Sequence, residues 1–482
     1  MKSEPVVLVI PNSRWFGKRV WLMLPHAALL LTALLKDEFD FSIIDANAGD
    51  LSEEQVRERL ASLRPSVVMV SALAVEYHDQ YHRIPELAKA AVPGVLTVFG
   101  GVYPSVLGEE ALRDPNVDYL FLGHAEERVG NFLRLALERD HGALRRLPGV
   151  AYRDEGGRQV INPATSFISS VKRLVKPDYS LIDVAAYMGH ASRDYQFNSQ
   201  RRAVPVITSY GCPYNCLFCA TRTISGTGMA YRPAEEVLEE IDFLVTRHKA
   251  DELIFLDDCL LGDRPRITRI LEGLVERNYP LVWKTSNVAA WHLKGDLLEL
   301  MRRSGCYQIT VSVESGSQRV LREVIHKPLK LEIVPPLVKA CRALGIDIGA
   351  NFVIGFPGET WDEIRETFRF AELCDFDITH FHIATPLPKT DLYLLAREKG
   401  LLPADFSFTD PRYFGFARAF IGTDEFTPEE LMTLRAYEWD RINFSTPEKI
   451  AKVARLMNFT PEEMAEHRRQ TRRKIGLHLA DG

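Results

Sequence analysis

The sequence lacks an apolar run long enough to cross a membrane. Its longest weakly polar stretch, Val20–Leu35, contains Pro25 and His26 and is shorter than the roughly 20 residues that a spanning helix needs. The start of the chain also lacks the pattern of a secretory signal peptide. We therefore expect a protein with no membrane partner in a reducing, cytoplasmic compartment.

The sequence also lacks a large excess of positive charge. The formal net charge is −6, with 46% hydrophobic and 26% charged residues among 482. A nucleic-acid polyanion is thereby excluded as the main partner, and the composition is that of an ordinary globular protein. The length predicts two or three domains.

Cysteine is scarce, and four of the seven cysteines stand alone in apolar surroundings. These solitary residues provide no second C-x2-C pair, which a structural zinc site would need. An odd number of cysteines without a signal peptide also argues against disulfides. We expect the four to be small buried residues: Cys259, Cys306, Cys341 and Cys374.

The other three cysteines form a tight C-x3-C-x2-C run made of Cys212, Cys216 and Cys219. The run follows an apolar, β-like segment, Val204–Thr208, so we expect it on a loop after a strand. Iron–sulfur clusters are usually held by four cysteines. Three thiolates can hold three irons of a [4Fe-4S] cube and leave the fourth iron open for a small molecule.

This run, with Phe218 just before the third cysteine, resembles the signature of the radical SAM superfamily. The resemblance implies that the open iron binds S-adenosylmethionine (SAM). It also implies that one electron then cleaves SAM and releases a 5′-deoxyadenosyl radical.

Residues 1–140 alternate short apolar runs with helical patterns, which predicts a doubly wound parallel sheet with helices on both faces. Ligands of such sheets bind outside the carboxyl ends of the strands. Small or polar residues stand at the expected strand ends, and we take these as candidate cofactor-binding residues: Asp45, Ser71, Gly100, Gly101 and Gly123.

These features resemble the cobalamin-binding domain that precedes many radical SAM cores. The sequence lacks the D-x-H-x-x-G motif of other cobalamin proteins, as is usual in this branch. It also has Tyr103 where His is common, and Gly123-His124-Ala125-Glu126 where Gly-Glu-Gly-Glu is common. Two interpretations follow, a domain that binds cobalamin and an empty scaffold.

Residues 141–203 read as a linker that contains a possible hairpin. From 204 to 402 the strand–helix alternation resumes with six units, which fits the partial (β/α)6 barrel of the superfamily. Residues 403–482 are predicted to be a helical C-terminal domain, with Thr-Pro-Glu-Glu helix starts at Thr427 and Thr460. The predicted fold class is therefore α/β, with two parallel-sheet domains and a helical cap.

Parallel strands end at one face, and that face carries the chemistry of a barrel. The family places a Glu-Ser-Gly run against SAM, here Glu314 and Ser315, and a glycine-proline turn against the adenine, here Gly355 and Pro357. Asn287 ends another strand and faces the same end, so it is a candidate to contact SAM or substrate.

Asp257 and Asp258 end the second strand of this core. A close acidic pair can accept hydrogen bonds from a substrate, or one member can act as an acid because its partner raises its pKa. The pair can equally be a helix cap and a salt bridge.

We weigh three hypotheses of function. The first is a radical SAM enzyme that methylates an unactivated carbon of a small molecule with methyl groups from cobalamin. The second is a cobalamin-independent radical dehydratase or deoxygenase acting on a sugar such as an aminoglycoside, with Asp257 or Asp258 moving protons. The third is a non-catalytic cofactor-binding protein. Either enzyme needs an electron donor such as flavodoxin, ferredoxin or a dedicated reductase.

Overall fold

The computed structural model describes residues 4–164, 174–188, 201–413 and 418–473. The chain divides into two compact units, Met1–Ser192 with Tyr210–Cys212 and Thr221–Arg232, and the remainder, Arg193–Ser209 with Pro213–Ala220 and Pro233–Gly482.

The first unit is built on a seven-stranded sheet of order β2-β1-β3-β4-β5-β6-β7. The first five strands are parallel, as predicted, because each returns to the sheet through a helix. The strands are β1 Pro5–Ile10, β2 Asp40–Asp45, β3 Val67–Ser71, β4 Leu96–Gly100, β5 Tyr119–Phe121, β6 Val150–Arg153 and β7 Gln159–Ile161.

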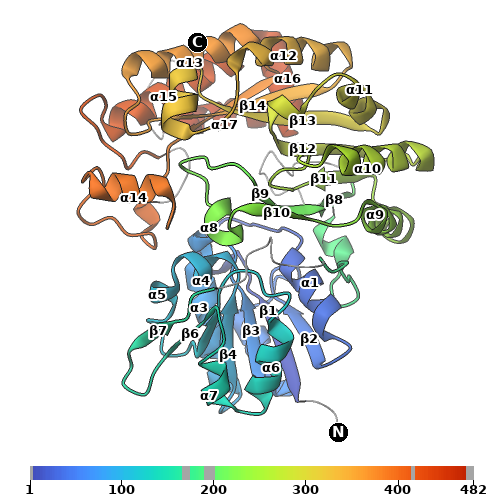
Figure 1. Ribbon diagram of the computed structural model, residues 1–482, viewed down its shortest axis with the longest axis vertical. Coiled ribbons are helices and arrows are strands. Elements are labelled where there is room, and N and C mark those ends of the chain that lie inside the picture. Colours follow the sequence, from blue (N-terminus) through green and yellow to red (C-terminus); the bar gives the residue numbers. More distant parts are fainter. Residues whose placement is uncertain (1–3, 165–173, 189–200, 414–417, 474–482) are drawn as a thin grey trace. The chain divides into compact units, whose positions relative to one another are not determined.

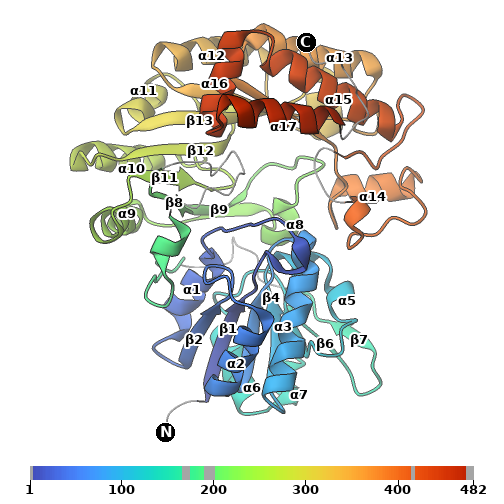
Figure 2. The same cartoon turned by 180° about the vertical axis from the view of Figure 1, so that it is seen from behind.

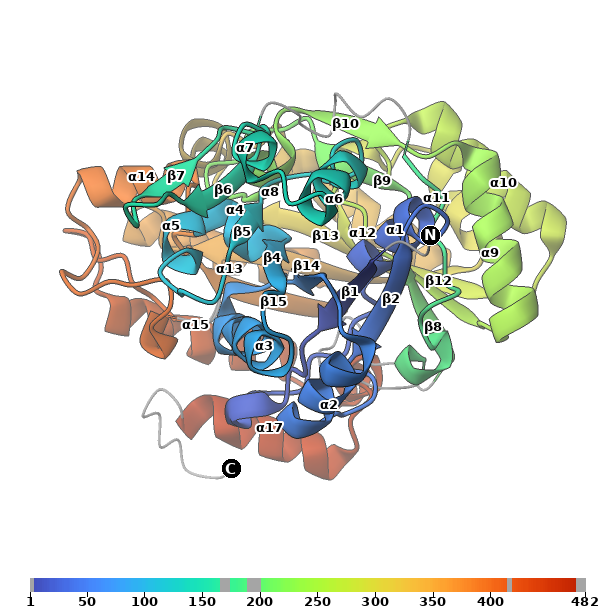
Figure 3. The same cartoon turned by 90° about the horizontal axis from the view of Figure 1, so that it is seen from below.

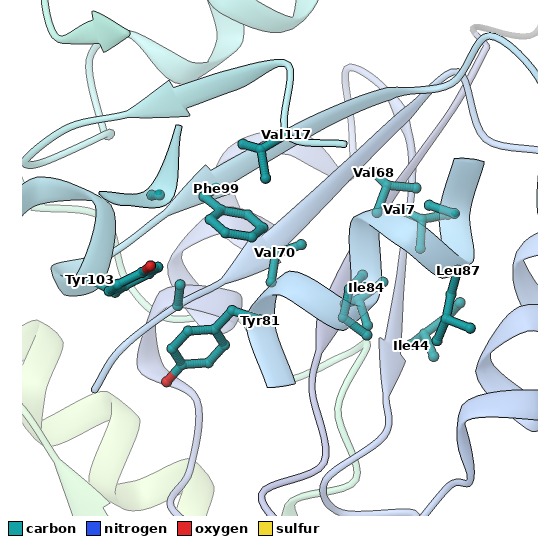
Figure 4. Packing of buried hydrophobic residues seen from close by; sticks show 14 of the residues in the cluster. Val7, Ile44, Val68, Val70, Tyr81, Ile84, Leu87, Phe99, Tyr103 and Val117 are labelled. Carbon is teal, nitrogen blue, oxygen red and sulfur yellow. The ribbon is translucent and has the colours of Figure 1, made fainter. Parts of the chain in front are cut away.

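Helices cover both faces of this sheet, with α2 and α3 on one side and α1 and α6 on the other (Figure 3). Strand residues such as Val7, Val68 and Val70 pack against Ile84 and Leu87 of α3 (Figure 4). The helices are α1 His26–Leu35, α2 Glu53–Leu63, α3 His78–Ala91, α4 Val102–Val106, α5 Gly108–Ala111, α6 Val129–Leu137, α7 His141–Leu144 and α8 Thr221–Ser225.

The sheet continues beyond residue 140, because the hairpin β6–β7 adds to the edge of β5 in antiparallel fashion. Part of the predicted linker thus completes the first sheet. Residues 165–173 and 189–200 of that linker, and 414–417 and 474–482 of the predicted C-terminal domain, lie outside the described residues. The domain boundaries stay a prediction.

The second unit contains a six-stranded, all-parallel sheet of order β15-β14-β13-β12-β11-β8 (Figure 1). All six strands fall on segments that the alternating pattern predicts. They are β8 Ala203–Val206, β11 Glu252–Phe255, β12 Val282–Val288, β13 Cys306–Glu314, β14 Asp347–Ile354 and β15 Ile378–Ile383. The carboxyl ends therefore lie along one edge, as a partial barrel requires.

A helix follows each of the inner strands and buries its apolar face against the sheet. A short π-helix, Val320–Ile325, follows β13, and such irregular turns are frequent at functional sites. The helices are α9 Ala234–His248, α10 Arg264–Arg277, α11 Asp296–Arg303, α12 Val334–Ala343, α13 Trp361–Cys374 and α14 Asp391–Glu398.

Three helices end the described chain and pack together, α15 Pro428–Asn443, α16 Pro447–Met457 and α17 Pro461–Arg473 (Figure 2). The α15 helix lies along β15, where Asn443 accepts a hydrogen bond from Thr379 N at 2.8 Å and donates one to Thr379 O at 3.0 Å. These bonds satisfy backbone groups that an edge strand would otherwise leave without partners.

The sequence pattern missed a small sheet beside the cysteine run. Strands β9 Ser209–Cys212 and β10 Gly228–Tyr231 pair with each other and flank the loop and α8. In the part of the chain that the structure describes, no helix has both the length and the apolar character needed to cross a membrane.

Candidate functional site

The cysteine loop begins where β9 ends, at Cys212, and carries Cys216 and Cys219. All three thiols are partly exposed, and Cys219 N donates a hydrogen bond to Cys216 O at 3.1 Å. None of the seven cysteines, all within described segments, forms a disulfide. The three thiols thus remain accessible to a ligand from solvent.

The other four cysteines are buried. Burial raises the pKa of Cys341 and of Cys374 to about 12, and it also raises the pKa of Cys306. These thiols stay protonated at neutral pH, whereas metals bind the thiolate. Their expected role as small apolar residues agrees with this burial.

The cysteine loop contacts three other parts of the second unit. Leu217 N donates to Ile325 O, at the end of the π-helix, at 3.0 Å, and Leu217 O accepts from Leu392 N of α14 at 2.9 Å. The ring of Phe218 lies 5.7 Å from that of Phe356, in the turn after β14. The loop is therefore fixed to the segments that follow β13, β14 and β15.

Glu314 is the last residue of β13 and adopts a left-handed backbone with φ of 70°. Strain of this kind at a non-glycine residue is typical of functional sites. Its carboxylate is buried and accepts a hydrogen bond from Lys327 Nζ at 3.0 Å. Sequence reasoning missed Lys327. In the sequence Lys327 is only a lysine thirteen residues after Glu314. That spacing does not by itself indicate that the two side chains meet.

Ser315 is fully buried and serves the turn itself. Its Oγ accepts from Ser317 N at 3.1 Å and lies 3.2 Å from Thr367 Oγ1 of α13. A Cβ on Gly316 would come within 2.6 Å of the Glu366 carbonyl oxygen. The turn after β13 thus packs tightly on α13, which holds Glu314 in place.

Gly355 and Pro357 lie in the turn after β14, as predicted. Glu359, another residue missed from the sequence, reaches back into this turn and accepts from Gly355 N at 2.7 Å and Phe356 N at 3.1 Å. A Cβ on Gly355, whose φ is 86°, would lie 2.6 Å from a methyl carbon of Leu431. The turn therefore requires glycine for both its conformation and its close packing.

Asp257 and Asp258 lie in different surroundings, the first buried and the second exposed. Asp257 is buried and accepts from Thr208 N at 3.1 Å, from Thr208 Oγ1 at 2.6 Å and from Ser209 Oγ at 2.6 Å. Burial raises its pKa against these bonds. Asp258 is exposed, as is Asn287 near the end of β12. The structure therefore gives Asp257 an anchoring position under the strand that leads to Cys212.

In the first unit, the sheet brings the strand-end residues to one edge, with Ser71 opposite Gly100 and Asp45 opposite Ile10. Asp45 is largely buried and accepts from the Tyr187 hydroxyl at 2.5 Å. Burial raises the pKa of Asp45, and the bonds from Ala48 and Tyr187 oppose this.

Gly100 ends β4 in open space, Gly101 follows it in a close backbone contact, and Gly123 lies just after β5. Gly101 has φ of 111°, and a Cβ there would lie 2.5 Å from Ala72 O. Gly123 N donates to Ser105 Oγ at 2.9 Å. At Gly101 and Gly123 the backbone, and not a side chain, lies at the carboxyl ends of the strands, where ligands of such sheets bind.

Tyr103 and His124 depart from the cobalamin-domain pattern, and both form polar contacts within the first unit. Tyr103 is buried, and its hydroxyl lies 2.9 Å from His82 Nε2, while His82 Nδ1 lies 2.7 Å from Asp114 Oδ2. His124 Nε2 lies 3.1 Å from Ser225 Oγ of α8. Tyr103 belongs to the buried hydrophobic cluster (Figure 4). The core therefore accommodates tyrosine at the position where histidine is common.

A cavity of about 40 Å³ lies at the carboxyl ends of β1 and β3. Its walls include Ser71, and Gln80, whose Oε1 is buried without a hydrogen-bond partner among the described residues. Buried acceptors normally have partners. The position and the unsatisfied acceptor fit a bound group that carries N–H or O–H donors, such as the amide side chains of cobalamin.

No group of three or more His, Cys, Asp or Glu side chains within the described segments is arranged to hold a metal ion. In a cube of iron and sulfide, each thiolate binds a different iron, so the three sulfurs do not converge on one ion. The donor set of three partly exposed thiols on one anchored loop fits such a cube.

Comparison with known proteins gives two domain matches. Residues 22–133 match the B12 binding domain, and residues 206–371 match the Radical SAM superfamily. Residues 206–371 are therefore a radical SAM domain. The chain carries a B12 binding domain ahead of the radical SAM core, and it is an enzyme. The hypothesis of a non-catalytic protein is therefore wrong.

Similar sequences within this superfamily include two enzymes of different chemistry. The cytidylyl-2-hydroxyethylphosphonate methyltransferase of Streptomyces wedmorensis is 29% identical, over 71% of this chain and 68% of its own length. The anaerobic magnesium-protoporphyrin IX monomethyl ester cyclase of Rubrivivax gelatinosus is 26% identical, over 73% of this chain and 62% of its own length.

Two solved structures share the fold of this radical SAM protein. The methyltransferase TsrM from Kitasatospora setae, with cobalamin and a [4Fe-4S] cluster bound, has a TM-score of 0.68 at 18% identity, covering 84% of this chain and 76% of TsrM. The cobalamin-dependent enzyme OxsB, with aqua-cobalamin and SAM bound, has a TM-score of 0.72 at 18% identity, covering 97% of this chain and 72% of OxsB. These likenesses confirm the predicted fold class.

Proposed function

We propose that this radical SAM enzyme transfers a methyl group from cobalamin to an unactivated carbon of a small molecule. The observation that carries the proposal is the loop of three accessible thiols, anchored to the strand ends that bear Glu314 and Gly355. The methyltransferase relatives and the B12 binding domain support the same outcome. When bound, the cluster supplies the electron that cleaves SAM, and cobalamin supplies the methyl group.

The pair of Glu314 and Lys327 suits the amino-acid end of SAM. That end carries an ammonium and a carboxylate, and the pair offers one buried charge of each sign at 3.0 Å separation. A charged group recognised in a site of low dielectric contributes strongly to specificity. We assign Glu314 to the ammonium or ribose hydroxyls and Lys327 to the carboxylate.

The turn Gly355–Gly358 suits the adenine. Phe356 in that turn contacts Phe218 of the cysteine loop, so an apolar wall lies next to the proposed cluster. Such a wall excludes water, which protects a reactive radical from side reactions. Asp257 and Asp258 then take different roles, Asp257 as an anchor of the chain and Asp258 as an exposed candidate for substrate contact.

In the first unit, the edge that carries Ser71, Gly100 and Gly101 is the proposed cobalamin site. Gln80 Oε1 is the acceptor that the cofactor's amide donors would satisfy there. This assignment favours cobalamin binding over the empty-scaffold interpretation.

One observation favours a second candidate, a radical dehydratase or deoxygenase that acts on a sugar such as an aminoglycoside. The relatives include cyclases as well as methyltransferases, so members of this group use the radical for more than methyl transfer. In that case the substrate hydrogen would be removed beside a hydroxyl and water would leave.

The proposal also includes a one-electron donor such as flavodoxin, ferredoxin or a dedicated reductase. A reducing, cytoplasmic compartment would suit an oxygen-sensitive cluster. Both remain predictions from the chemistry.

The test is anaerobic reconstitution of the full chain with iron, sulfide and cobalamin, followed by product analysis with SAM and dithionite. Formation of S-adenosylhomocysteine together with 5′-deoxyadenosine supports methyl transfer. Formation of 5′-deoxyadenosine without S-adenosylhomocysteine favours the dehydratase. A protein that binds no iron–sulfur cluster would refute both.

A further inference from the structure

A chain of hydrogen bonds ties the middle of the cysteine loop to the segment after β12. Tyr214 lies between Cys212 and Cys216 in the sequence. Its hydroxyl accepts from Trp291 Nε1 at 2.7 Å and lies 2.8 Å from His292 Nε2.

One hydrogen-bond direction in this chain is fixed by its donor, Trp291. The Trp291 indole can only donate, so it occupies an acceptor site on the Tyr214 oxygen. The tautomer of His292 decides whether the Tyr214 hydroxyl donates to His292 Nε2 or accepts from it. The three rings also pack on one another, with Tyr214 and Trp291 in edge-to-face contact at 5.0 Å, which favours a single orientation of the loop.

The same chain reaches the proposed SAM site. Lys327 Nζ lies 5.5 Å from the centre of the Trp291 ring and donates to Glu314. A cation over an indole ring is attracted to it. Glu314, Lys327, Trp291 and Tyr214 therefore form one continuous path from the strand end after β13 to the cysteine loop, all within the second unit.

We propose that Tyr214, Trp291 and His292 are positioning residues for the cysteine loop and couple its position to SAM binding at Glu314 and Lys327. This inference rests on the proposed function, since it concerns the same cluster and the same SAM. The coupling has a physical basis. When SAM binds to Glu314, Lys327 or both, the Lys327 ammonium moves relative to the Trp291 ring. Trp291 is in turn hydrogen-bonded to Tyr214 of the loop.

The experiment compares reconstituted full-length variants. Tyr214→Phe removes the hydroxyl that joins Trp291 and His292. His292→Gln keeps an acceptor, and Tyr279→Phe removes a hydroxyl that donates to Asp242, away from the loop. Iron content, the electron paramagnetic resonance spectrum of the reduced cluster with and without SAM, its midpoint potential and SAM cleavage per cluster are measured for each.

We expect Tyr214→Phe to retain iron, because the three cysteines remain. Its spectrum with SAM and its midpoint potential should shift, and cleavage per cluster should fall about tenfold or more, since small misplacements of reacting groups have large effects on rate. His292→Gln and Tyr279→Phe should remain near wild type. An unchanged spectrum, potential and cleavage rate in Tyr214→Phe would overturn the proposal.

A double-mutant cycle tests the coupling separately. SAM affinity is measured for Tyr214→Phe, Lys327→Met and the double variant in cluster-loaded protein. Non-additive effects support the coupling, and additive effects overturn it. Wild-type protein without a cluster would instead refute the proposed function. If Tyr214→Phe fails to fold, the comparison of His292→Gln with His292→Leu replaces it, with a shifted spectrum expected only for His292→Leu.

Discussion

The carboxylate of Glu359 lies against the backbone of Gly355, with 2.7 Å between Oε2 and the glycine nitrogen. Oε1 is buried and has no hydrogen-bond partner among the described residues. This arrangement holds the turn after β14 from within the core. It also places a titratable group where water cannot solvate its charge.

Burial raises the pKa of Glu359 to about 8, against the opposing hydrogen bonds from Phe356 and Gly355. The unfolded chain loses this proton near the ordinary pKa of 4.5, and the folded chain keeps it until about 8. The contribution of Glu359 to stability is therefore full at low pH and declines as the pH rises through that window, by up to about 1.4 kcal/mol per pH unit.

Glu359→Gln imitates the protonated acid, so we expect it to remove this decline and to stabilise the protein at pH 8 relative to wild type. Thermal unfolding of both proteins across the window measures the difference. The exposed variant Glu398→Gln is the control and should leave the curve unchanged. Parallel curves for wild type and Glu359→Gln would contradict the prediction.

Replacing Cys216 by Ala should abolish both cluster binding and SAM cleavage, because two thiolates leave the cube without its third protein ligand. Cys374→Ala is the matched control, since that thiol is buried on α13. It should retain iron and lose only roughly 1 kcal/mol of stability through the small cavity. Iron analysis after anaerobic reconstitution separates the two, and full iron content in Cys216→Ala would refute the assignment.

Asp257→Asn and Asp258→Asn should differ in stability. Asp257 accepts three hydrogen bonds in the core, so an amide there mispairs at least one donor and costs about 1–3 kcal/mol. Asp258 is exposed, and its amide variant should unfold like wild type. Urea titrations of both variants test this. Equal stabilities would show that Asp257 is not an anchor.

Gly101→Ala and Gly100→Ala form another matched pair in the first unit. A Cβ at Gly101 meets the Ala72 carbonyl oxygen at 2.5 Å, and its φ of 111° is unfavourable for alanine, whereas a Cβ at Gly100 meets nothing within 4 Å. We expect a loss of about 2 kcal/mol or more at Gly101 and little change at Gly100. Equal midpoints in denaturant would contradict this.

Lys327→Met should weaken SAM binding about tenfold or more, because it leaves a buried carboxylate without its partner and removes a cation from the site. The double variant with Glu314→Gln should recover stability, since the unpaired charge is gone, but not SAM affinity. Exposed Lys399→Met is the control. Restored SAM affinity in the double variant would assign the pair a structural role alone.

Much of the fold could be predicted because local patterns report it. The alternation of strands and helices located all six strands of the second sheet, and Thr427 followed by Pro428 marked a helix start that the structure confirms with a capping box. The same Thr-Pro pattern at Thr446 begins α16. The cysteine spacing located the loop because its three ligands are neighbours in the sequence.

The rest depended on contacts between distant segments. Lys327 meets Glu314, Glu359 reaches back to Gly355, and Trp291 binds Tyr214 across 77 positions. In the sequence, Asp257 and Asp258 form a candidate acidic pair. In the structure, Asp257 is buried and accepts hydrogen bonds from Thr208, whereas Asp258 is exposed. Residue order alone therefore determined the strands, the helix starts and the thiol loop, because these depend on periodicity and short spacing. Only the tertiary structure decided which side chains hold that loop and which charges are buried, because both depend on what packs against them.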